Sequence, residues 1–450
     1  MTRRTLAPEG PSFSTSSTLD ETGLALALAP ALTPEGVDSS PSFFHGFLTQ
    51  PKVYAQCLLV LAEVTRTRYF VPPQMAAAAA MRDPVFTAHG DRLRAEVFSA
   101  CNSVSARLDL GADGLDGGEI GYGTTNVDLG DHLQQMLSGI HHNELLHLDV
   151  GSQHVNVSTL ERTESERKVV MPTRWVRAFG NVAEIHRGFS GVLDLDGRGA
   201  RRLLMALPQA KVDTVWVQAS TRGVNVSARP VPGAVRIPGP VRLQPLRRLL
   251  SLLTGVQIYQ DAGSGAGVVM ECRLPGAAIT LALSEEPSRG FSGEGSLLSA
   301  MASEDVVDDA DLLATQLGFS SRISPDLLAL DTGLERVRVD QALASLAASG
   351  KVGWDIAEQA YYHRELPHDP EQVARDNPRL VGARRLVDAR AVHWSKDRLT
   401  ANVRSGARSY QVIPDKGTCS CTWYLRTRGS RGPCKHLLAA ALSTETREGV

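Results

Sequence analysis

The sequence predicts an α+β protein of several domains, with a small metal-binding module near its C-terminal end. Three observations point to this fold class. The chain has 450 residues, which is more than one domain usually holds. Its middle part contains patterns typical of a strand, a helix and two strands, and this order recurs. Three of its six cysteines fall within one short window close to the end.

The N-terminal residues 1–40 are rich in Ser, Thr, Pro and Gly and poor in aromatic residues, which predicts a disordered segment. Order is expected to begin at Phe43. Residues 51–68 predict a one-faced amphipathic helix, because apolar side chains recur at helical spacing at Val53, Cys57, Val60, Leu61 and Val64. The alanine run at 76–80 predicts a further short helix, with a linker as the alternative.

Residues 41–300 form the predicted main α+β domain, and much of it reads as an internal repeat. Alternating apolar and polar residues over 93–110 predict strands, and the glycine-rich stretch 111–123 predicts a loop. The sequence Val-Asn-Val-Ser occurs at both 155–158 and 224–227 and aligns two strand-helix-strand-strand units. The first unit has strand 126–129, helix 133–140 and strands 145–150 and 155–159; the second has strand 192–195, helix 200–207 and strands 214–218 and 224–228.

A looser third copy follows, with a helix at 246–253 and strands near 256–259, 268–272 and 279–283. Between the first two copies, residues 172–187 predict a helix that turns Trp175, Phe179 and Val182 inward. Repeated units of this kind bury their helices on one face of an antiparallel sheet. They resemble the units of ring-shaped DNA clamps at the level of fold alone, and an ordinary α+β scaffold with duplicated topology is favoured.

An acidic stretch at 303–311 predicts a boundary, and residues 305–367 form the next predicted domain. Three helices are predicted at 310–317, 324–331 and 336–348. A hairpin is predicted to follow, with strands at 351–355 and 360–364. This order resembles a winged helix, which implies DNA binding. Residues 305–366, however, hold five basic and eleven acidic residues, a net charge of −6. Because DNA-reading domains are basic on the binding face, this charge favours protein contact or scaffolding.

The strongest chemical signal is Cys419-Ser-Cys421, followed after twelve residues by Cys434-Lys-His436. Three thiolates and one imidazole complete the tetrahedral set of a structural zinc ion and leave no position open for water. Side chains two residues apart on an extended chain point to opposite faces, so the chain must turn within each pair. One alternative is three buried cysteines that only cluster. The other is a catalytic zinc site, which a fourth protein ligand disfavours.

The flanking residues predict a small ββα zinc module within the domain 385–445. Strands at 402–403 and 410–413 precede the first pair of ligands. Gly432-Pro433 breaks the chain before the second pair, and the apolar, alanine-rich stretch 437–442 predicts a helix that begins at the metal.

Three features around the ligands follow a known pattern. They are the leader Val403-Arg-Ser-Gly-Ala-Arg-Ser-Tyr410-Gln-Val412, the residue Trp423 and the ending Arg431-Gly-Pro-Cys-Lys-His436. Together with the ligand spacing they resemble the SWIM zinc finger over about residues 390–445. The resemblance implies a structural zinc ion and binding to nucleic acid or protein, sometimes beside an ATPase. The wider chain is similar to actinobacterial SWIM family proteins, some of which are encoded near MoxR-type ATPases and von Willebrand A-domain proteins.

The C-terminal part is basic although the whole chain has a net charge of −2. Residues 371–436 carry fourteen Lys or Arg and five Asp or Glu. Between the outermost metal ligands there is no acid, and the basic residues are Arg426, Arg428, Arg431 and Lys435. These four are the predicted contacts to phosphates or to an acidic partner surface. A solvated face that compensates the anionic metal site is the equally weighted alternative.

Several other classes of protein are disfavoured. No Gly-x-x-x-x-Gly-Lys-Ser/Thr or Gly-x-Ser-x-Gly motif occurs, and no set of carboxylates or histidines forms a catalytic pattern. His141, His142 and His147 lack metal-ligand spacing, and the glycines of 263–267 predict a hairpin loop rather than a dinucleotide site. SWIM modules also accompany transposases and ubiquitin ligases, but the acidic triad and the RING cysteines of those enzymes are missing.

The remaining composition bears on location. No apolar run of 18 residues exists, so no membrane span is expected, and the polar start does not resemble a signal peptide. Cys57, Cys101 and Cys272 are widely separated, which together with a zinc site favours the reducing cytoplasm. Seven lysines against forty arginines indicate a GC-rich bacterial genome.

The sequence therefore predicts a zinc-binding, non-catalytic adaptor whose SWIM module binds nucleic acid or a protein partner. The alternatives are a subunit of a MoxR/von Willebrand A-type ATPase system that acts through protein contacts alone, or an enzyme with an unrecognised site. Neither a membrane nor a small-molecule substrate is expected as a partner.

Overall fold

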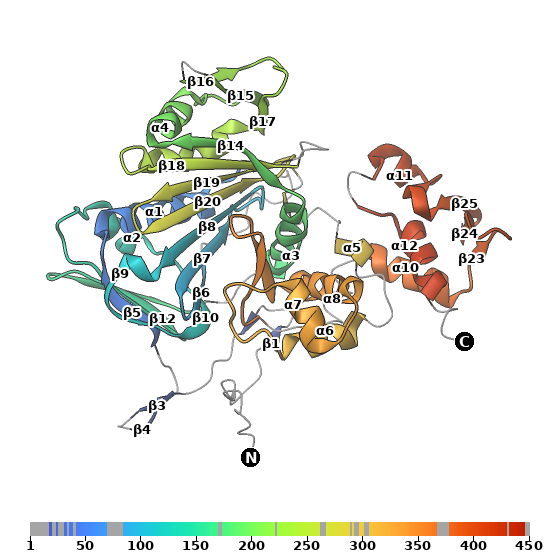
Figure 1. Ribbon diagram of the computed structural model, residues 1–450, viewed down its shortest axis with the longest axis horizontal. Helices are drawn as coiled ribbons and strands as arrows, with labels where there is room; N and C mark the ends of the chain where they lie inside the picture. The colour runs from blue at the N-terminus through green and yellow to red at the C-terminus, as the bar shows by residue number, and fades with distance from the viewer. Residues whose placement is uncertain are drawn as a thin grey trace.

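The computed structural model of the chain has three parts in sequence order: residues 42–291, 297–366 and 378–445 (Figure 1). The described residues are 18–19, 24–25, 31–33, 36–38, 42–69, 84–169, 173–220, 223–261, 267–288, 290–291, 297–300, 306–366, 378–429 and 432–445. No helix among them is long and apolar enough to cross a membrane.

Within the first forty residues the described segments are two short antiparallel hairpins. They pair β1 (Thr18–Leu19) with β2 (Leu24–Ala25) and β3 (Ala31–Thr33) with β4 (Gly36–Asp38). The rest of 1–40 lies outside the described residues, so disorder there stays a prediction. The helix predicted at 76–80 also lies outside them.

An eight-stranded antiparallel sheet forms the centre of the first part. Its strands, in spatial order, are β10 (Tyr122–Asn126), β6 (Val85–His89), β7 (Arg92–Phe98), β8 (Val104–Gly111), β20 (Ala277–Leu283), β19 (Val268–Leu274), β18 (Gly255–Gln260) and β14 (Ser190–Asp196). The pairing of β8 with β20 joins strands from the two halves of the predicted main domain. The strands predicted over 93–110 are confirmed, and β18 and β19 form the hairpin expected around 263–267.

Two smaller sheets flank the large one. One has the order β13 (Thr163–Arg167), β12 (His154–Ser158), β11 (His147–Gly151), β5 (Ser42–Leu48) and β9 (Leu115–Ile120). The other has the order β16 (Gly223–Ser227), β15 (Thr214–Ser220) and β17 (Val235–Pro238).

The loop predicted at 111–123 is wrong. That stretch contains the 3₁₀ turn η1 (Ala112–Gly114), strand β9 and the start of β10. Its glycines allow strand pairing here rather than prevent it. Gly118 has a φ of +129°, and a Cβ at this position would collide with the backbone of His45 on the neighbouring strand β5.

Helices cover one face of the large sheet. The predicted helix over 51–68 is confirmed as α1 (Pro51–Arg66), which contacts β7, β8 and β20 and also α2 (Asp131–Ser138) and η2 (Pro240–Leu249). Near the sheet edge, α4 (Gly197–Ala206) packs on β16 and β18. The helix predicted at 246–253 is instead the earlier 3₁₀ segment η2, which has Pro245 in its interior, where proline lacks an N–H donor and its ring would clash with the preceding turn of an α-helix.

The elements of the predicted repeat occur in the expected order, but they are distributed over different sheets. In the first copy, β10 belongs to the large sheet while β11 and β12 belong to the five-stranded sheet. In the second copy, β14 belongs to the large sheet while β15 and β16 belong to the three-stranded sheet. The prediction that each copy's strands form one sheet covered by the helices is therefore wrong for the first two copies, because the strands of each belong to two different sheets.

The second part contains α5 (Leu297–Ala300), α6 (Val306–Ala314), α7 (Pro325–Thr332), α8 (Arg336–Ala348) and the antiparallel hairpin of β21 (Val352–Asp355) with β22 (Ala360–His363). Three of the helices and the hairpin follow the predicted order. The boundary predicted at 303–311 overlaps α6, whose first turn contains Asp308 and Asp309. Acidic residues stabilise the positive end of a helix dipole there. Residues 303–305 lie outside the described residues, so the boundary stays a prediction.

This part packs directly on the first, through α3 (Thr173–Arg187), which contacts both α8 and β21. On α3, Trp175 and Phe179 are buried and Val182 is partly buried, as predicted. Both aromatic rings make edge-to-face contacts with Phe98, a residue of the large sheet. The helix therefore joins the large sheet to the second part of the chain.

Strand β7 is buried on both faces. Leu93 and Ala95 face a small apolar cavity that Tyr54 and Leu58 of α1 also line. Arg94 and Glu96, which alternate with them, instead bond to Asp355 of the hairpin and to Arg364 just after it. The Arg364 Nε donates to Glu96 Oε2 at 2.5 Å, and Arg94 pairs with both Asp109 and Asp355. Burial alone would raise the pKa of Glu96, but the charge and hydrogen bonds of Arg364 lower it.

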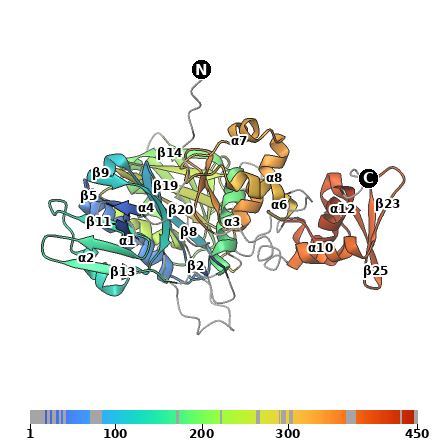
Figure 2. The same ribbon diagram turned by 90° about the horizontal axis from the view of Figure 1, so that it is seen from below.

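The third part is larger than the predicted ββα module. Its sheet has the order β23 (Val392–Trp394), β24 (Ala401–Ser405), β25 (Arg408–Ile413) and β26 (Thr418–Cys419). The helices are α10 (Pro378–Asp388), α11 (Thr422–Thr427) and α12 (Lys435–Glu445), with the short turn η4 (Pro414–Lys416). The two predicted strands and the helix are present, but α12 packs mainly on α10, whose start precedes the predicted limit at 385. Both views place this part at one end of the molecule (Figures 1 and 2).

Candidate metal centre

The four predicted ligands lie at the ends of three elements. Cys419 ends β26, Cys421 is the N-cap residue of α11, Cys434 directly precedes α12, and His436 lies in the first turn of α12. The chain leaves the strand at Ser420, where the backbone N–H donates to Gln411 O at 2.9 Å. The Gln411 N–H donates in return to Ser420 Oγ at 2.9 Å. These bonds hold the turn that brings the first pair together.

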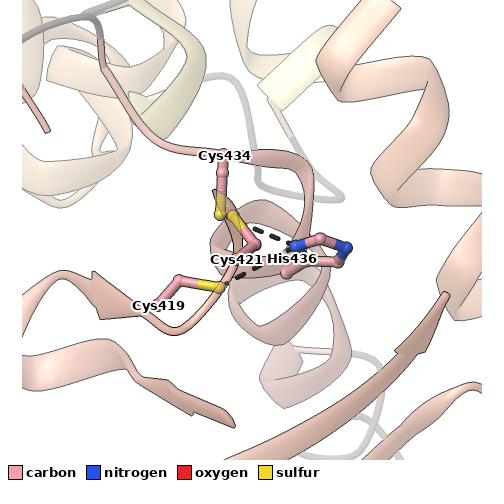
Figure 3. Close-up of side chains that lie close together, drawn as sticks. All are labelled: Cys419, Cys421, Cys434 and His436. Atoms are coloured by element: carbon pink, nitrogen blue, oxygen red, sulfur yellow. Dashed lines mark hydrogen bonds between the residues drawn. The ribbon is translucent and has the colours of Figure 1, made fainter. Parts of the chain in front are cut away.

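The donor atoms form one compact group. All four lie within 4.8 Å of one another, and His436 Nδ1 is 3.8 Å from Cys419 Sγ and 3.9 Å from Cys434 Sγ (Figure 3). Tetrahedral zinc with bonds of about 2.3 Å to sulfur and about 2.0–2.1 Å to nitrogen separates such atoms by about 3.6 Å. Each ligand side chain is at most 4% exposed. The group fits a closed structural zinc site.

His436 contributes Nδ1 rather than Nε2 to this group. Its ring stacks on Tyr410 of β25, with centroids 4.5 Å apart and planes at 30°. Its Nε2 is buried and has no hydrogen-bond partner among the described residues. The orientation of the imidazole is therefore held by stacking, which gives a structural role to the tyrosine of the leader motif.

The protonation of the thiols without metal is uneven. A hydrogen bond from Cys419 lowers the pKa of Cys434 to about 4; burial opposes this shift, and the backbone N–H groups of His436 and Leu437 add to it. The same contact, together with burial, raises the pKa of Cys419, and burial raises the pKa of Cys421. Zinc binds cysteine as the thiolate, so binding at this site releases protons and depends on pH.

The predicted basic contacts lie beside the metal centre. Arg426 is exposed on α11, Arg428 is exposed just after it, and Lys435 is half-buried at the start of α12. Within the described part of the chain these three form no ion pair. Arg431 lies outside the described residues. The structure thus brings two exposed arginines to one short helix and places the lysine beside Gly382 of α10.

One basic residue of the site was not predicted. The Arg379 guanidinium on α10 lies 4.8 Å from the centre of the Trp423 ring, and its Nη1 donates to Pro433 O at 2.9 Å. It therefore links α10 to the segments on both sides of the metal. No sequence pattern indicates this role, because Arg379 lies forty residues before the first ligand, outside the recognisable motif.

The histidines set aside from the sequence belong to no metal-binding group. Among the described residues, the three cysteines and His436 are the one group of three or more ligating side chains close enough to hold an ion. His141, His142 and His147 are not part of it.

Comparison with known proteins identified a family for one segment and found only weak similarity to solved structures over 54% of the chain. No curated protein matches the chain. Two solved structures align with 54% of it: the Proliferating Cellular Nuclear Antigen from Entamoeba histolytica, at 11% identity over 99% of that chain, and the C-terminal region of FEN-1 bound to A. fulgidus PCNA, at 12% identity over 97%. Both have a TM-score of 0.36.

Residues 410–445 match the family model of the SWIM zinc finger. This range contains all four ligands, the stacking tyrosine and helix α12. The segment is therefore a SWIM zinc finger, and its three cysteines and one histidine form a site for a structural zinc ion.

Proposed function

We propose that the chain is a non-catalytic adaptor in which zinc folds the C-terminal unit, residues 378–445, and the basic surface of that unit binds nucleic acid through its phosphates. The observation that carries this proposal is a charge imbalance. Residues 378–445 hold thirteen Lys or Arg against four Asp or Glu. Arginines are exposed on both α10 and α11, as Arg384, Arg385 and Arg426 illustrate.

Rigid support makes these arginines suited to phosphate binding. Helix α11 is held at its start by the metal ligand Cys421 and on its side by the contact between Arg379 and Trp423. Arg426 and Arg428 project from this fixed base without an acidic partner among the described residues. A guanidinium with no competing carboxylate can donate two hydrogen bonds to one phosphate.

The second part of the chain has features that favour contact with protein. Its described residues 306–366 hold five basic and ten acidic residues, a net charge of −5. The hairpin that would form the wing of a winged helix is almost entirely buried against the large sheet. A wing that reads DNA has to be exposed, so this part is proposed to act as a scaffold or protein-binding surface.

Fluorescence anisotropy of the full, zinc-loaded chain with a labelled duplex and a labelled single strand tests the proposal. Replacing Arg426 and Arg428 by Glu should weaken binding at least tenfold, and affinity should fall steeply between about 50 and 200 mM salt. The matched control reverses two exposed charges of the first part, Lys211→Glu with Arg229→Glu, and should bind as wild type. No binding at low salt, or equal weakening by the control, refutes the nucleic-acid function.

A protein partner is the second candidate, including an ATPase of the MoxR and von Willebrand A-domain type. The acidic second part, which exposes several apolar side chains, favours it. In this case the chain would fail to bind either nucleic acid, while a candidate ATPase subunit would bind in titration calorimetry. That binding should be lost when the partner is titrated into a variant of the second part in which the exposed Leu327 and Leu330 are replaced by Ser.

A further inference from the structure

Helix α7 exposes most of its apolar side chains. Leu327 is 60% exposed and Leu330 is 79% exposed, whereas Leu328 alone is buried. Leu327 and Leu330 are three residues apart and so share one face of the helix. Val337, in the first turn of the adjacent helix α8, is 64% exposed. Clustered apolar exposure of this kind is typical of a surface that contacts another protein.

Two exposed acidic residues lie in the same stretch of the chain as these apolar residues. Asp331, at the end of α7, and Glu335, before α8, are exposed and form no ion pair within the described part of the chain. We call the set of Leu327, Leu330, Val337, Asp331 and Glu335 the acidic face. Its chemistry fits a partner surface that combines an apolar side chain with free positive charges.

The zinc unit presents such a surface on α11. Leu425 is 63% exposed and is followed by the exposed Arg426 and Arg428. We call these three residues the basic face. The net charge of the zinc unit is +9 and that of residues 306–366 is −5, although the whole chain carries only −2. Opposite charges are thus separated within one chain, each beside exposed leucines.

The two faces do not meet within one chain in this structure. In both views, α7 lies farther from the zinc unit than α6 and α8 do (Figures 1 and 2), and Figure 1 shows α11 as part of that unit. Each face is therefore free to meet the complementary face of another molecule.

We propose that the acidic face of one copy binds the basic face of a second copy, so that the chain associates head to tail. Such a contact joins two different surfaces and leaves one face free at each end of the assembly. It also covers Arg426 and Arg428 and therefore competes with any anion that binds there. The self-association does not depend on the nucleic-acid function, because it is measured without nucleic acid.

Sedimentation velocity of the full, zinc-loaded chain tests this association over a range of concentrations. Dimers and longer species are expected at about 50 mM salt, and they should dissociate at about 500 mM, where charges are screened beyond roughly 5 Å. A monomer under all conditions, or an association that does not respond to salt, overturns the proposal. A monomer that expands as salt is raised would show that the acidic face contacts the zinc unit of its own chain. That result also overturns the proposal.

Two surface variants test which faces are involved. Leu327→Ser with Leu330→Ser should weaken association at least tenfold, and so should Arg426→Glu with Arg428→Glu. A mixture of the two variants should form a dimer and nothing larger, because each supplies the intact face that the other lacks. The control, Leu145→Ser with Leu160→Ser, removes two leucines of the first part that are 52% and 84% exposed and should associate as wild type.

All variants should retain one zinc per chain, which shows that the zinc unit is folded. If both surface variants associate as wild type, or if their mixture stays monomeric, the two faces do not bind each other. A wild-type chain that self-associates but binds neither nucleic acid would refute the proposed function alone.

Discussion

His436 links the metal centre to the sheet that supports it. Its Nδ1 lies among the thiols while its ring stacks on Tyr410, a residue of the strand next to the one that ends in Cys419. Cys434 lies at the start of the same helix as His436. Each ligand is therefore fixed by a neighbouring element, and removal of one ligand should release several of them.

Replacing Cys434 by Ser should abolish stoichiometric zinc binding and unfold residues 378–445. Structural zinc in small fingers contributes about 10–16 kcal/mol of apparent binding free energy at neutral pH, and that energy is folding energy. Metal analysis of freshly reduced protein, together with the fluorescence of Trp394 and Trp423, measures both effects. Cys101→Ser is the control, because Cys101 lies among Ser99 and Ser103 and not at the metal. One retained zinc in the Cys434 variant would contradict the assignment.

Two buried histidines predict a loss of stability in acid. Burial lowers the pKa of both His186 and His363 from 6.5 to about 3. Between these values the unfolded chain binds protons that the folded chain does not, so stability is present at neutral pH and is lost as the pH falls below 6.5. From pH 7 to pH 5 each histidine should cost about 2 kcal/mol.

His186→Leu should remove one of these contributions. The difference in unfolding free energy between variant and wild type should shift by about 2 kcal/mol in favour of the variant between pH 7 and pH 5. Urea titrations at both pH values measure it, and the difference cancels effects of pH on the zinc unit. His132→Leu, at an exposed position, should show no such shift. A pH-independent difference for His186→Leu would contradict the prediction.

At the scale of elements, the hairpin of β21 and β22 closes the second face of β7. Arg364 and Glu96 belong to different parts of the chain, yet their side chains are only 2% and 7% exposed and are bonded to each other. The Arg364 guanidinium also lies 4.1 Å from the centre of the Phe179 ring. A buried charge that loses its partner is costly, so this pair couples the hairpin to the sheet.

Arg364→Met should destabilise the chain by about 3–5 kcal/mol, because Glu96 would remain buried without its partner. Adding Glu96→Met should recover part of the loss. Arg336→Met is the matched control: its partners Asp326 and Asp340 are 77% and 29% exposed, and the change should cost about 1 kcal/mol. Urea unfolding of the four proteins decides the outcome. Equal costs for the buried and exposed pairs would show that the hairpin is not held by this contact.

At the scale of the whole molecule, the buried apolar residues form two clusters. One fills the first part around α1 and the large sheet. The other runs from α6 and α8 into the zinc unit, where it includes Val403 and Leu438. The cysteine ligands of the metal therefore belong to the second cluster, whereas the large sheet belongs to the first.

Chelation of zinc should loosen the third part and spare the first. Hydrogen exchange should rise across 378–445, most clearly at β24, where Val403 is fully buried. Exchange at β7 and β8 should stay unchanged, since these strands belong to the other cluster. Mass spectrometry of exchanged peptides, before and after removal of the metal, measures both regions. Increased exchange in the large sheet would show that the two cores are coupled.

Local patterns predicted the elements that depend on local chemistry. The helix of 51–66 follows from apolar spacing, and the metal ligands follow from residue type and separation. The predictions failed where a distant contact overrides the local signal. The glycine-rich stretch 111–123 became strand because β5 supplies a partner. The helix predicted at 246–253 failed for a local reason instead, because Pro245 inside η2 does not fit the interior of an α-helix.

The sequence by itself determined the zinc site, because ligand identity and spacing are properties of eighteen consecutive residues. It also determined where the chain is basic and where it is acidic. Only the tertiary structure decided which charges are available to a partner. Arg364 and Glu96 are 268 residues apart and neutralise each other in a buried contact, whereas Arg426, Leu327 and Leu330 stay at the surface. Burial depends on which distant segments pack together, and no local pattern specifies that.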